Sequence, residues 1–437
     1  MELNHFKFLK SLNHERLIFL YYTIFESIYL ATFDRFIIPF LVSKNVSNVW
    51  ISNLIALIYL LSGIIGLFYA NLATSNNRKK ILVYTISFQV VSLFIFFILS
   101  FFNVLWYIYL ILSLIILILQ LSYAPVSTSL YGDLIKGNND ENTYLGIRAA
   151  IAEFTIFVIS FIFSLLLDIS LKWFVLIFLI AFLGRFLSLL ILKRRFKNPK
   201  TSLEKLSFKE FLRNMNVTNF GLFAEFLFFF YFAAYIAVPF FTPYMFKELN
   251  FNYIQYFVIN SLMSIVIVFF SPLIGKLCDK YGERAIFVSA GFIIATIPFL
   301  WTLSKNFVYL VFIEIFASFG WASFNLATAD FLITHVDSKI RHTITAYIFF
   351  IRNLGIAIGS FLGSFLITQS TTIVGIFIVS SILRFLAVLL FGMNVKETKT
   401  VEKFKFLNFI NEKLHQIKLL PKKSEDKKRD LYYLNKP

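Results

Sequence analysis

The chain has 437 residues, of which 59% are hydrophobic and only 15% are charged, and its mean hydropathy is +0.77. Soluble domains are about 45–50% apolar, so this composition excludes a soluble globular fold and predicts a polytopic membrane protein. The formal net charge of +17 would suit a nucleic-acid partner, while the single cysteine, Cys278, excludes an intramolecular disulfide and a thiolate metal cluster.

Apolar runs of membrane-spanning length follow one another along most of the chain. A spanning helix needs roughly 20 mostly apolar residues, and this rule predicts an all-α polytopic membrane protein with 12 transmembrane helices in two pseudo-symmetric six-helix bundles. The first run is not followed by a small-residue cleavage site, so we expect the first helix to be retained. The expected helices cover roughly residues 16 to 41, 50 to 72, 81 to 102, 104 to 129, 145 to 167, 172 to 192, 217 to 243, 253 to 274, 285 to 304, 306 to 332, 343 to 368 and 372 to 393.

Four segments of different character are expected: an N-terminal six-helix bundle (1–193), a cytoplasmic linker (194–216), a C-terminal six-helix bundle (217–394) and a basic cytoplasmic tail (395–437). In the linker, Ser207 and Glu210 have the spacing of a capping box, which predicts a short amphipathic helix. In the tail, Leu407, Ile410 and Leu414 recur at helical spacing among lysines. This pattern predicts a helix lying on the inner leaflet, with a disordered solvated tail as the alternative.

Positive charge is distributed unequally between the two sides of the expected helices. With both termini inside, most of the 41 lysines and arginines fall on the cytoplasmic side, as the positive-inside rule requires. This bias accounts for the net charge without a nucleic acid. The lysines on the outer side are Lys44, Lys172, Lys247 and Lys305.

The two halves repeat at a shift of about 200 residues. Pro39-Phe40 corresponds to Pro239-Phe240, Ser160-Phe161 corresponds to Ser360-Phe361, and other pairs fall one residue from this register. Agreement across several helix pairs predicts a duplicated six-helix unit. Parallel six-helix repeats related by an axis along the membrane normal are a transporter architecture.

The most distinctive stretch lies between the eighth and ninth expected helices, where Gly275, Asp279, Gly282 and Arg284 form the pattern G-x-x-x-D-x-x-G-x-R. Gly275 would allow a neighbouring helix to approach closely, Gly282 can adopt the positive φ of a tight reversal, and Asp279 can face the next helix N-terminus. Together with the helix count, the linker and the repeat, this motif resembles the major facilitator superfamily.

The resemblance implies a transporter whose two bundles alternate access to a midplane site, with helices 1, 4, 7 and 10 lining the central cavity. It also implies that Asp279 takes part in cytoplasmic contacts that hold the inner side closed. The first-half copy of the motif has Gly66 but has Asn71 instead of the aspartate, so we expect unequal gating of the halves. The gating candidates are Gly275, Asp279, Gly282, Arg284 and Arg341, the two arginines being the alternative partners of Asp279.

Carboxylates inside the spans are the candidates for proton coupling. Ionisable groups there cost roughly 2.5–3.5 kcal/mol on insertion scales, so they tend to face protein or a water-filled cavity. Glu26 lies about 15 Å into the first helix at 1.5 Å per residue, and Glu225 is its approximate counterpart on the seventh. A third candidate, Asp34, lies beside Arg35 near the outer end of the first helix, where an interfacial anchor is the alternative. For Glu26 and Glu225 the alternative is an interhelical hydrogen bond that only fixes packing.

Three helices carry candidate substrate contacts. On the tenth, polar residues recur on one face about 80° wide with a tryptophan in its middle, and on the fourth a shorter stripe is interrupted by Pro125, which can kink the helix. On the eleventh, Arg352 could neutralise an anionic substrate or pair with a buried acid such as Glu314 or Glu153. The predicted substrate-binding residues are Gln120, Tyr123, Ser127, Glu314, Ser318, Trp321, Asn325, Arg352 and Asn353.

Two further features are interpreted as structural. Gly355, Gly359 and Gly363 have the GxxxGxxxG spacing that permits close helix packing. Arg185 and Arg384 occupy approximately matching positions on the sixth and twelfth helices, which are peripheral in the resembled fold.

The sequence therefore predicts a proton-coupled secondary transporter in the cell membrane, with both termini cytoplasmic. We expect a monomer that exports a small amphipathic or cationic solute, with no nucleic-acid partner, cofactor or metal. No G-x-x-x-x-G-K-[ST] motif occurs, which excludes ATP hydrolysis by this chain and argues against an enzyme. The alternatives are a proton symporter for a sugar, peptide or organic anion, and a lipid-handling protein or sensor on the same fold.

Overall fold

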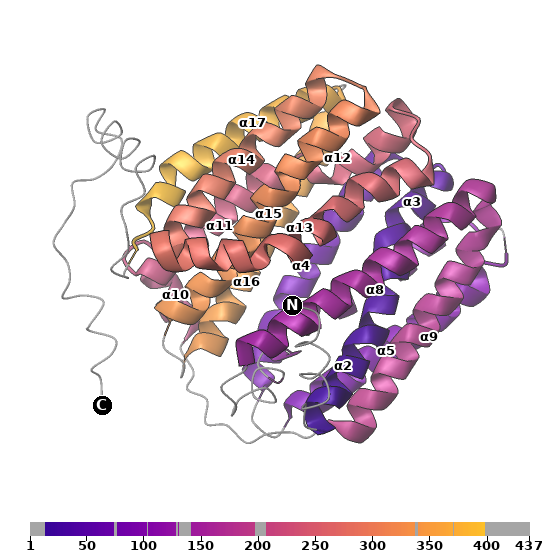
Figure 1. Cartoon of the computed structure of the whole chain (residues 1–437), viewed down its shortest axis with the longest axis horizontal. Helices are drawn as coiled ribbons and strands as arrows, with labels where there is room; N and C mark the ends of the chain where they lie inside the picture. Colours follow the sequence, from indigo (N-terminus) through magenta and orange to yellow (C-terminus); the bar gives the residue numbers. More distant parts are fainter. Residues whose placement is uncertain are drawn as a thin grey trace. The chain divides into compact units, whose positions relative to one another are not determined.

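The computed structural model describes residues 14–73, 77–102, 104–127, 130, 141–196, 207–336, 340–369 and 371–397. All regular structure in these ranges is helical, as the sequence predicts (Figure 1). The amphipathic helix expected beyond residue 400 lies outside the described residues. The contacts divide the chain into two compact units: unit 1 comprises Met1–Val46, Phe68–Leu203 and Asn250–Phe257, and unit 2 comprises Ser47–Leu67, Glu204–Leu249 and Val258–Pro437.

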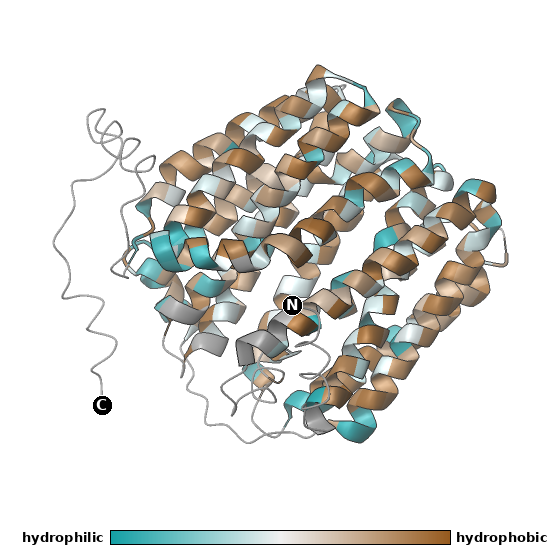
Figure 2. Cartoon of the chain, in the orientation of Figure 1, coloured by the Kyte–Doolittle hydropathy of each residue, from teal (hydrophilic) through white to brown (hydrophobic). Residues whose placement is uncertain are grey.

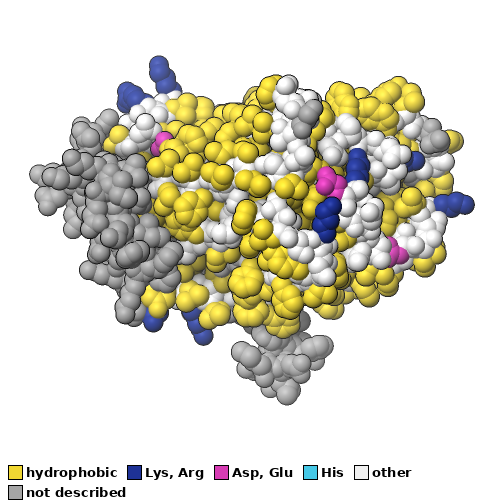
Figure 3. Space-filling model, turned by 90° about the horizontal axis from the view of Figure 1, so that it is seen from above, with side chains coloured by type: hydrophobic (Ala, Val, Ile, Leu, Met, Phe, Trp, Pro, Cys, Tyr) yellow, Lys and Arg dark blue, Asp and Glu magenta, His cyan; other side chains and the backbone are white. Residues whose placement is uncertain are grey.

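Eleven helical segments in the described ranges are long and apolar enough to cross a membrane. Brown predominates along the long helices in Figure 2, and hydrophobic side chains cover most of the described surface seen in Figure 3. Large apolar side chains such as Phe88 and Phe269 are each 72% exposed, which is expected where the solvent is lipid. Together with the first expected span, described next, these segments agree with the predicted polytopic all-α class.

Three consecutive elements occupy the first expected span: α2 (His14–Tyr29), η1 (Leu30–Asp34) and α3 (Arg35–Ser43). η1 is a turn of π-helix, closed by a bond from the Arg35 N–H to the Leu30 carbonyl. Pro39 has no N–H to offer the Arg35 carbonyl four residues earlier, and the Tyr256 hydroxyl donates to that carbonyl at 3.1 Å. The Arg35 carbonyl, which Pro39 leaves without its helical donor, therefore finds a donor in another segment of unit 1.

The rest of unit 1 packs around an aromatic core. Phe40 and Phe96 each meet Phe178, with ring centroids 4.9 and 4.6 Å apart. Phenylalanine side chains therefore fill the space between these helices. The remaining helices of unit 1 are α5 (Arg78–Leu99), α6 (Trp106–Ser122), α8 (Glu141–Ile169), η2 (Leu171–Trp173) and α9 (Phe174–Arg195).

Unit 2 contains most of α4 and nearly all of the second half. Its core is also aromatic, with Phe223 against Phe331 and Phe230 against Phe324, both at 4.5 Å between ring centroids. Its elements are α4 (Asn48–Leu72), α10 (Phe208–Arg213), α11 (Asn219–Tyr235), α12 (Val238–Pro243), η3 (Tyr244–Glu248), α13 (Tyr253–Tyr281), α14 (Glu283–Leu303), α15 (Phe307–His335), α16 (Arg341–Thr368), α17 (Ile373–Leu390) and η4 (Gly392–Asn394).

The glycine stripe of α16 packs against α11, as its spacing predicts. A Cβ atom at Gly355, Gly359 or Gly363 would overlap a backbone carbonyl oxygen, that of Phe228, Phe232 or Ile236 respectively. The two backbones therefore lie in direct contact, and only glycine fits at these three positions.

The helix expected in the linker is present as α10, but the predicted capping box is wrong. Ser207 is the N-cap residue, yet its side chain makes no capping hydrogen bond. Aromatic packing positions α10 instead, since Phe208 and Phe211 lie with ring centroids 4.9 and 5.3 Å from that of Tyr347 on α16.

The turn at Gly282 separates α13 from α14 with a single residue. Gly282 has φ +85°, which confirms the predicted positive φ. The close helix approach expected at Gly275 is absent, because a Cβ placed there would meet no described atom within 4 Å.

Candidate functional site

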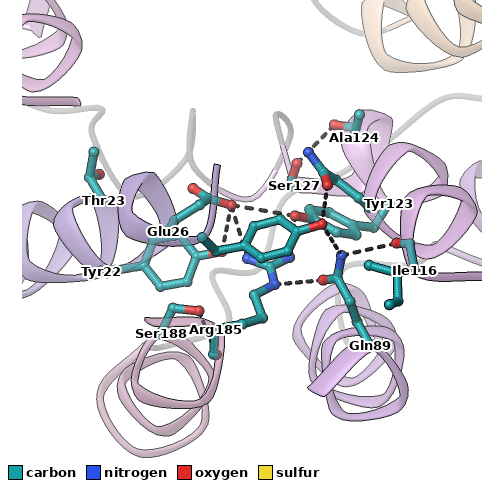
Figure 4. Close-up of polar contacts among 12 residues, drawn as sticks. Tyr22, Thr23, Glu26, Gln89, Ile116, Tyr123, Ala124, Ser127, Arg185 and Ser188 are labelled. Atoms are coloured by element: carbon teal, nitrogen blue, oxygen red, sulfur yellow. Dashed lines mark hydrogen bonds and ion pairs between the residues drawn. The ribbon is translucent and has the colours of Figure 1, made fainter. Parts of the chain in front are cut away.

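A polar network inside unit 1 joins four helices (Figure 4). α2 contributes Glu26, α9 contributes Arg185, α5 contributes Gln89, and Tyr123 caps the C-terminus of α6. The side chains of Arg185, Gln89 and Tyr123 each lie within hydrogen-bonding distance of another residue of the network, although they are far apart in the sequence. The network is therefore a product of helix packing.

The centre of the network is an ion pair between Glu26 and Arg185. Arg185 Nη1 lies 3.4 Å from Glu26 Oε1, and the arginine side chain is fully buried whereas that of the glutamate is 16% exposed. The hydroxyls of Tyr22 and Tyr123 donate to the same carboxylate oxygen at 3.2 and 3.4 Å. The carboxylate thus has a compensating charge, two hydroxyl donors and limited access to its surroundings.

The other side of the Arg185 guanidinium is held by neutral groups. Its Nε donates to Gln89 Oε1 at 2.6 Å and its Nη2 donates to the Tyr123 hydroxyl. The Gln89 amide is oriented for this role because its Nε2 donates to the Ile116 carbonyl at 3.1 Å and to the Tyr29 hydroxyl at 3.0 Å. Arg185 therefore keeps hydrogen-bond partners even if Glu26 loses its charge.

Tyr29 extends the network to a predicted substrate contact. Its hydroxyl donates to Gln120 Oε1, and its ring lies 5.1 Å from the Arg185 guanidinium carbon. Of the fourth-helix stripe, Gln120 and Tyr123 join the network, whereas the buried Ser127 hydroxyl donates to the Ala124 carbonyl at 3.0 Å. The helix is interrupted at Tyr123, two residues before Pro125, as the proline suggested.

This arrangement can exchange a proton without leaving a bare charge in an apolar interior. Removing one member of a buried ion pair usually costs about 3–5 kcal/mol because the remaining charge is uncompensated. Here a proton on Glu26 would leave Arg185 with the Gln89 and Tyr123 oxygens as acceptors, which lowers that cost. A change of one unit charge at Glu26 is therefore chemically feasible.

Unit 2 contains a different polar cluster, around Arg352 on α16. Its guanidinium nitrogens lie 3.3 and 3.4 Å from Asn353 Oδ1, and its Cζ lies 5.5 Å from the Tyr231 ring centroid. Within the described residues Arg352 forms no ion pair, so the pairing with Glu314 or Glu153 that the sequence left open is not present. Asn353 is fully buried and donates to Ser62 Oγ at 3.4 Å.

The polar face of α15 does not form one site. Ser318 is 1% exposed, whereas Asn325 is exposed. Glu314 lies beside the buried Trp301 indole. Trp321 packs in the aromatic core, 6.1 Å from Phe230 and 6.2 Å from Tyr231 between ring centroids.

The other two predicted coupling residues do not belong to the ion-pair network. Glu225, on α11, is partly buried and forms no hydrogen bond or ion pair with any described residue. Asp34, in η1, has an exposed side chain and likewise makes no such bond in the described ranges. The repeat in the sequence therefore places two glutamates at matching positions in different surroundings.

The gating candidates are only partly brought together. Asp279 is exposed, and no described residue forms an ion pair with it. Arg284 instead donates from Nη2 to the Met393 carbonyl at 2.7 Å, and its backbone N–H donates to Glu397 at 3.2 Å. Arg341 is the first residue of α16, and its side chain lies outside the described set. The gate remains a prediction.

Sequence reasoning missed the two residues that hold the Glu26 carboxylate network together, Arg185 and Gln89. A usable signal was present, because an arginine inside an apolar span is by default a functional candidate. Arg185 was instead interpreted as structural, because Arg384 occupies the approximately matching position in the second half. Arg384 has the structural role expected of both, since it donates to the Ala234 and Ile294 carbonyls and to Ser380 Oγ.

Comparison with known proteins finds a family model that matches part of the chain and solved structures with a similar fold. The model of the Major Facilitator Superfamily matches residues 226–419. Among solved structures, the nucleoside transporter NupG is similar with a TM-score of 0.68 and 11% identity over 86% of this chain and 99% of that one. The search of curated protein sequences finds no match.

Two other solved structures are similar over 86% of this chain. One is a POT family transporter in complex with a thioalcohol-conjugated peptide, with a TM-score of 0.67, 13% identity and 94% of its own chain covered. The other is the human organic anion transporter MFSD10 (TETRAN), with a TM-score of 0.60, 13% identity and 99% of its chain covered. At these identities the likeness concerns the fold.

The helical spans and their lipid-compatible surfaces define a multi-pass membrane protein, and its fold is that of the similar solved structures. The family model of the Major Facilitator Superfamily matches only residues 226–419, and the similar structures share the fold of this chain. The subfamily is not assigned.

Proposed function

We propose that this chain is a proton-coupled secondary transporter of a small organic solute, that it works by alternating access in the cell membrane, and that Glu26 is its proton-exchange site. The observation that carries the proposal is the ion pair of the partly exposed Glu26 carboxylate with the fully buried Arg185 guanidinium. Two tyrosine hydroxyls and the Gln89 amide complete the site. Buried carboxylates with an assigned counter-ion are the usual elements of proton relays in membranes.

For the substrate, the charge distribution favours an organic anion over the cation that the sequence suggested first. Glu26 is already compensated by Arg185, so it is a poor site for a cationic solute. Arg352 forms no ion pair in the described ranges and lies against the rings of Tyr231 and Phe349. A guanidinium beside aromatic faces suits a small anion with an apolar or aromatic part, which corresponds to proton symport.

Export of an amphipathic cation is the second candidate. It is favoured by Glu314, which forms no ion pair with a described residue and lies near tryptophan. The similar structures include transporters of nucleosides, organic anions and peptides, so the fold is compatible with several solute classes.

The test uses the full-length protein in two stages. A thermal-shift panel of benzoate, uridine, dialanine and tetraphenylphosphonium identifies a ligand, since a ligand at about 100 times its Kd stabilises by roughly 2.7 kcal/mol. Uptake of that ligand is then measured in proteoliposomes with an imposed pH gradient. We expect Glu26→Gln to abolish pH-driven accumulation while retaining exchange of labelled for unlabelled solute.

Glu153→Gln provides the matched control, because Glu153 is a carboxylate in an α8 span that makes no hydrogen bond or ion pair with any described residue. It should accumulate solute as the parent does. Unchanged pH-driven accumulation in Glu26→Gln would remove Glu26 as the coupling site, and failure of every solute to bind or move would favour the sensor alternative.

A further inference from the structure

A chain of hydrogen bonds leads from the Glu26–Arg185 ion pair to a partly exposed amide on α6. Arg185 Nε donates to Gln89 Oε1 at 2.6 Å (Figure 4). Gln89 Nε2 donates to the Tyr29 hydroxyl at 3.0 Å, and this hydroxyl donates to Gln120 Oε1. Tyr29 and Gln89 are 1% and 0% exposed, whereas Gln120 is only partly buried. A buried path thus connects the ion pair with a side chain that is open to its surroundings.

The direction of each bond in this chain is fixed by its ends. A guanidinium only donates and a backbone carbonyl only accepts. Gln89 Nε2 donates to the Ile116 carbonyl at 3.1 Å while Gln89 Oε1 accepts from Arg185, so two separate contacts give the amide the same orientation. The Tyr29 oxygen accepts from this amide, and the Tyr29 proton is therefore directed to Gln120.

A proton on Glu26 changes the strength of these bonds. It removes the negative charge that offsets Arg185, so the guanidinium donates more strongly to Gln89 Oε1. Successive hydrogen bonds in a protein interior polarise one another, and the effect therefore passes through Tyr29 to the Gln120 amide. The N–H groups of this amide become stronger donors as a result.

We propose that Gln120 donates to a carboxylate oxygen of the solute, and that Tyr29 is the positioning residue through which solute binding is coupled to the Glu26 proton. The inference rests on the proposed proton exchange at Glu26 and adds the path of the coupling and the group of the solute that it acts on. Tyr29 holds the oxygen of the Gln120 amide, so an acceptor on the solute can meet its N–H groups. Because linkage is reciprocal, the bound solute raises the proton occupancy of Glu26.

Other groups near Glu26 act on its proton directly. The charged and titratable side chains around this part of α2 come from α2 itself and from α6, α8 and α9, and include Tyr22, Tyr123, Arg148 and Arg185. Tyr29 differs from them because its hydroxyl proton goes to Gln120. Removing that hydroxyl therefore tests the path rather than the proton site.

Tyr29→Phe removes the hydroxyl and keeps the ring. The ring retains its contacts with Phe33, at 6.0 Å between ring centroids, and with the Arg185 guanidinium carbon, at 5.1 Å. Tyr109→Phe is the matched control, since Tyr109 is another buried tyrosine of unit 1 and its hydroxyl donates to backbone carbonyls.

The experiment measures the Kd of benzoate, the anion of the thermal-shift panel, for the full-length protein in detergent at pH 5.5 and 8. We expect the parent and Tyr109→Phe to bind at least ~5-fold more tightly at pH 5.5, and Tyr29→Phe to bind nearly equally at both pH values. Gln120→Leu should bind less tightly than the parent at pH 5.5. The infrared band of the protonated Glu26 carboxyl, assigned with Glu26→Gln, should persist in Tyr29→Phe and so show an intact proton site.

The outcomes separate this inference from the proposed function. If the parent Kd does not depend on pH, or if its dependence survives in Glu26→Gln, proton coupling at Glu26 is wrong and so is the path. If Glu26→Gln loses the dependence but Tyr29→Phe keeps the parent ratio of the two Kd values, the path alone is overturned. Loss of the carboxyl band in Tyr29→Phe also overturns it, because the tyrosine then acts on Glu26 itself.

Discussion

Arg185 and Arg384 show how one residue type can perform two tasks within one chain. Both are almost completely buried inside apolar helices. Arg384 donates to the Ala234 carbonyl at the end of α11 and to the Ile294 carbonyl in α14, so its charge is shared among neutral acceptors. Arg185 is paired with the Glu26 carboxylate, whose charge can change. Only the second arrangement pairs the guanidinium with an acidic side chain.

The pairing of Arg185 with Glu26 predicts a non-additive double-mutant cycle. Arg185→Met should be strongly destabilising, by about 3–5 kcal/mol, because it leaves the partly exposed Glu26 carboxylate without its counter-charge. Adding Glu26→Gln should recover part of that loss, with a coupling of roughly 0.5–3 kcal/mol. Thermal or denaturant unfolding in detergent measures the stability of the parent, the two single variants and the double variant.

The corresponding cycle of Arg384→Met with Glu225→Gln serves as its control. Glu225 forms no ion pair with any described residue, so these two changes should add. Additive losses for Arg185 and Glu26 as well would show that their contact does not contribute to stability.

Helix positions follow from apolar length, but helix irregularities do not. The spans expected at 50 to 72 and 372 to 393 are close to α4 (Asn48–Leu72) and α17 (Ile373–Leu390), because hydrocarbon thickness sets their length. The π-turn at Leu30–Asp34 leaves no mark in the pattern of apolar residues. Gln89 and Arg185 are hydrogen-bond partners although they are 96 residues apart. Such a contact depends on how several helices pack together, which the sequence of one helix does not indicate.

The contact of α16 with α11 predicts that Gly359 tolerates no side chain. Gly359→Ala would force the two backbones apart at the Phe232 carbonyl, and overpacking of this kind usually costs about 1–3 kcal/mol. Gly359→Val should cost more. The unfolding temperature in detergent and the yield of monodisperse protein report the effect.

Gly275→Ala is the comparison within the same unit. Its Cβ would meet no described atom within 4 Å, and alanine in place of glycine within a helix gains up to about 1 kcal/mol. Equal losses at Gly275 and Gly359 would contradict close packing as the reason for the glycine stripe.

At the level of the whole chain, the duplicated halves are chemically unequal. The fold follows from composition, helix count and repeat, all visible in the sequence. Glu26 could be selected from the sequence as a candidate, since an acid within a span is conspicuous. The surroundings of Glu26 could not be predicted in this way. Arg185 of unit 1 pairs with Glu26, whereas Glu225 forms no ion pair within the described part of unit 2. The repeat in the sequence predicts which positions of the two halves correspond. The side-chain contacts at each position cannot be predicted from the repeat.

The proposed coupling between a proton at Glu26 and a solute has to be reciprocal, because each ligand then changes the affinity of the other by the same factor. A proton on Glu26 removes one negative charge from the molecule. If the solute is an anion, as Arg352 suggests, its Kd should fall as the pH falls. If the solute is a cation carried by antiport, its Kd should rise. Typical couplings of 1–3 kcal/mol correspond to roughly 5–150-fold, so titrations of the detergent-solubilised protein between pH 5.5 and 8 resolve either direction.

Glu26→Gln should bind the solute with a Kd that no longer depends on pH, and Glu153→Gln should keep the parent dependence. A pH-dependent Kd that survives in Glu26→Gln would place the coupled proton on another group.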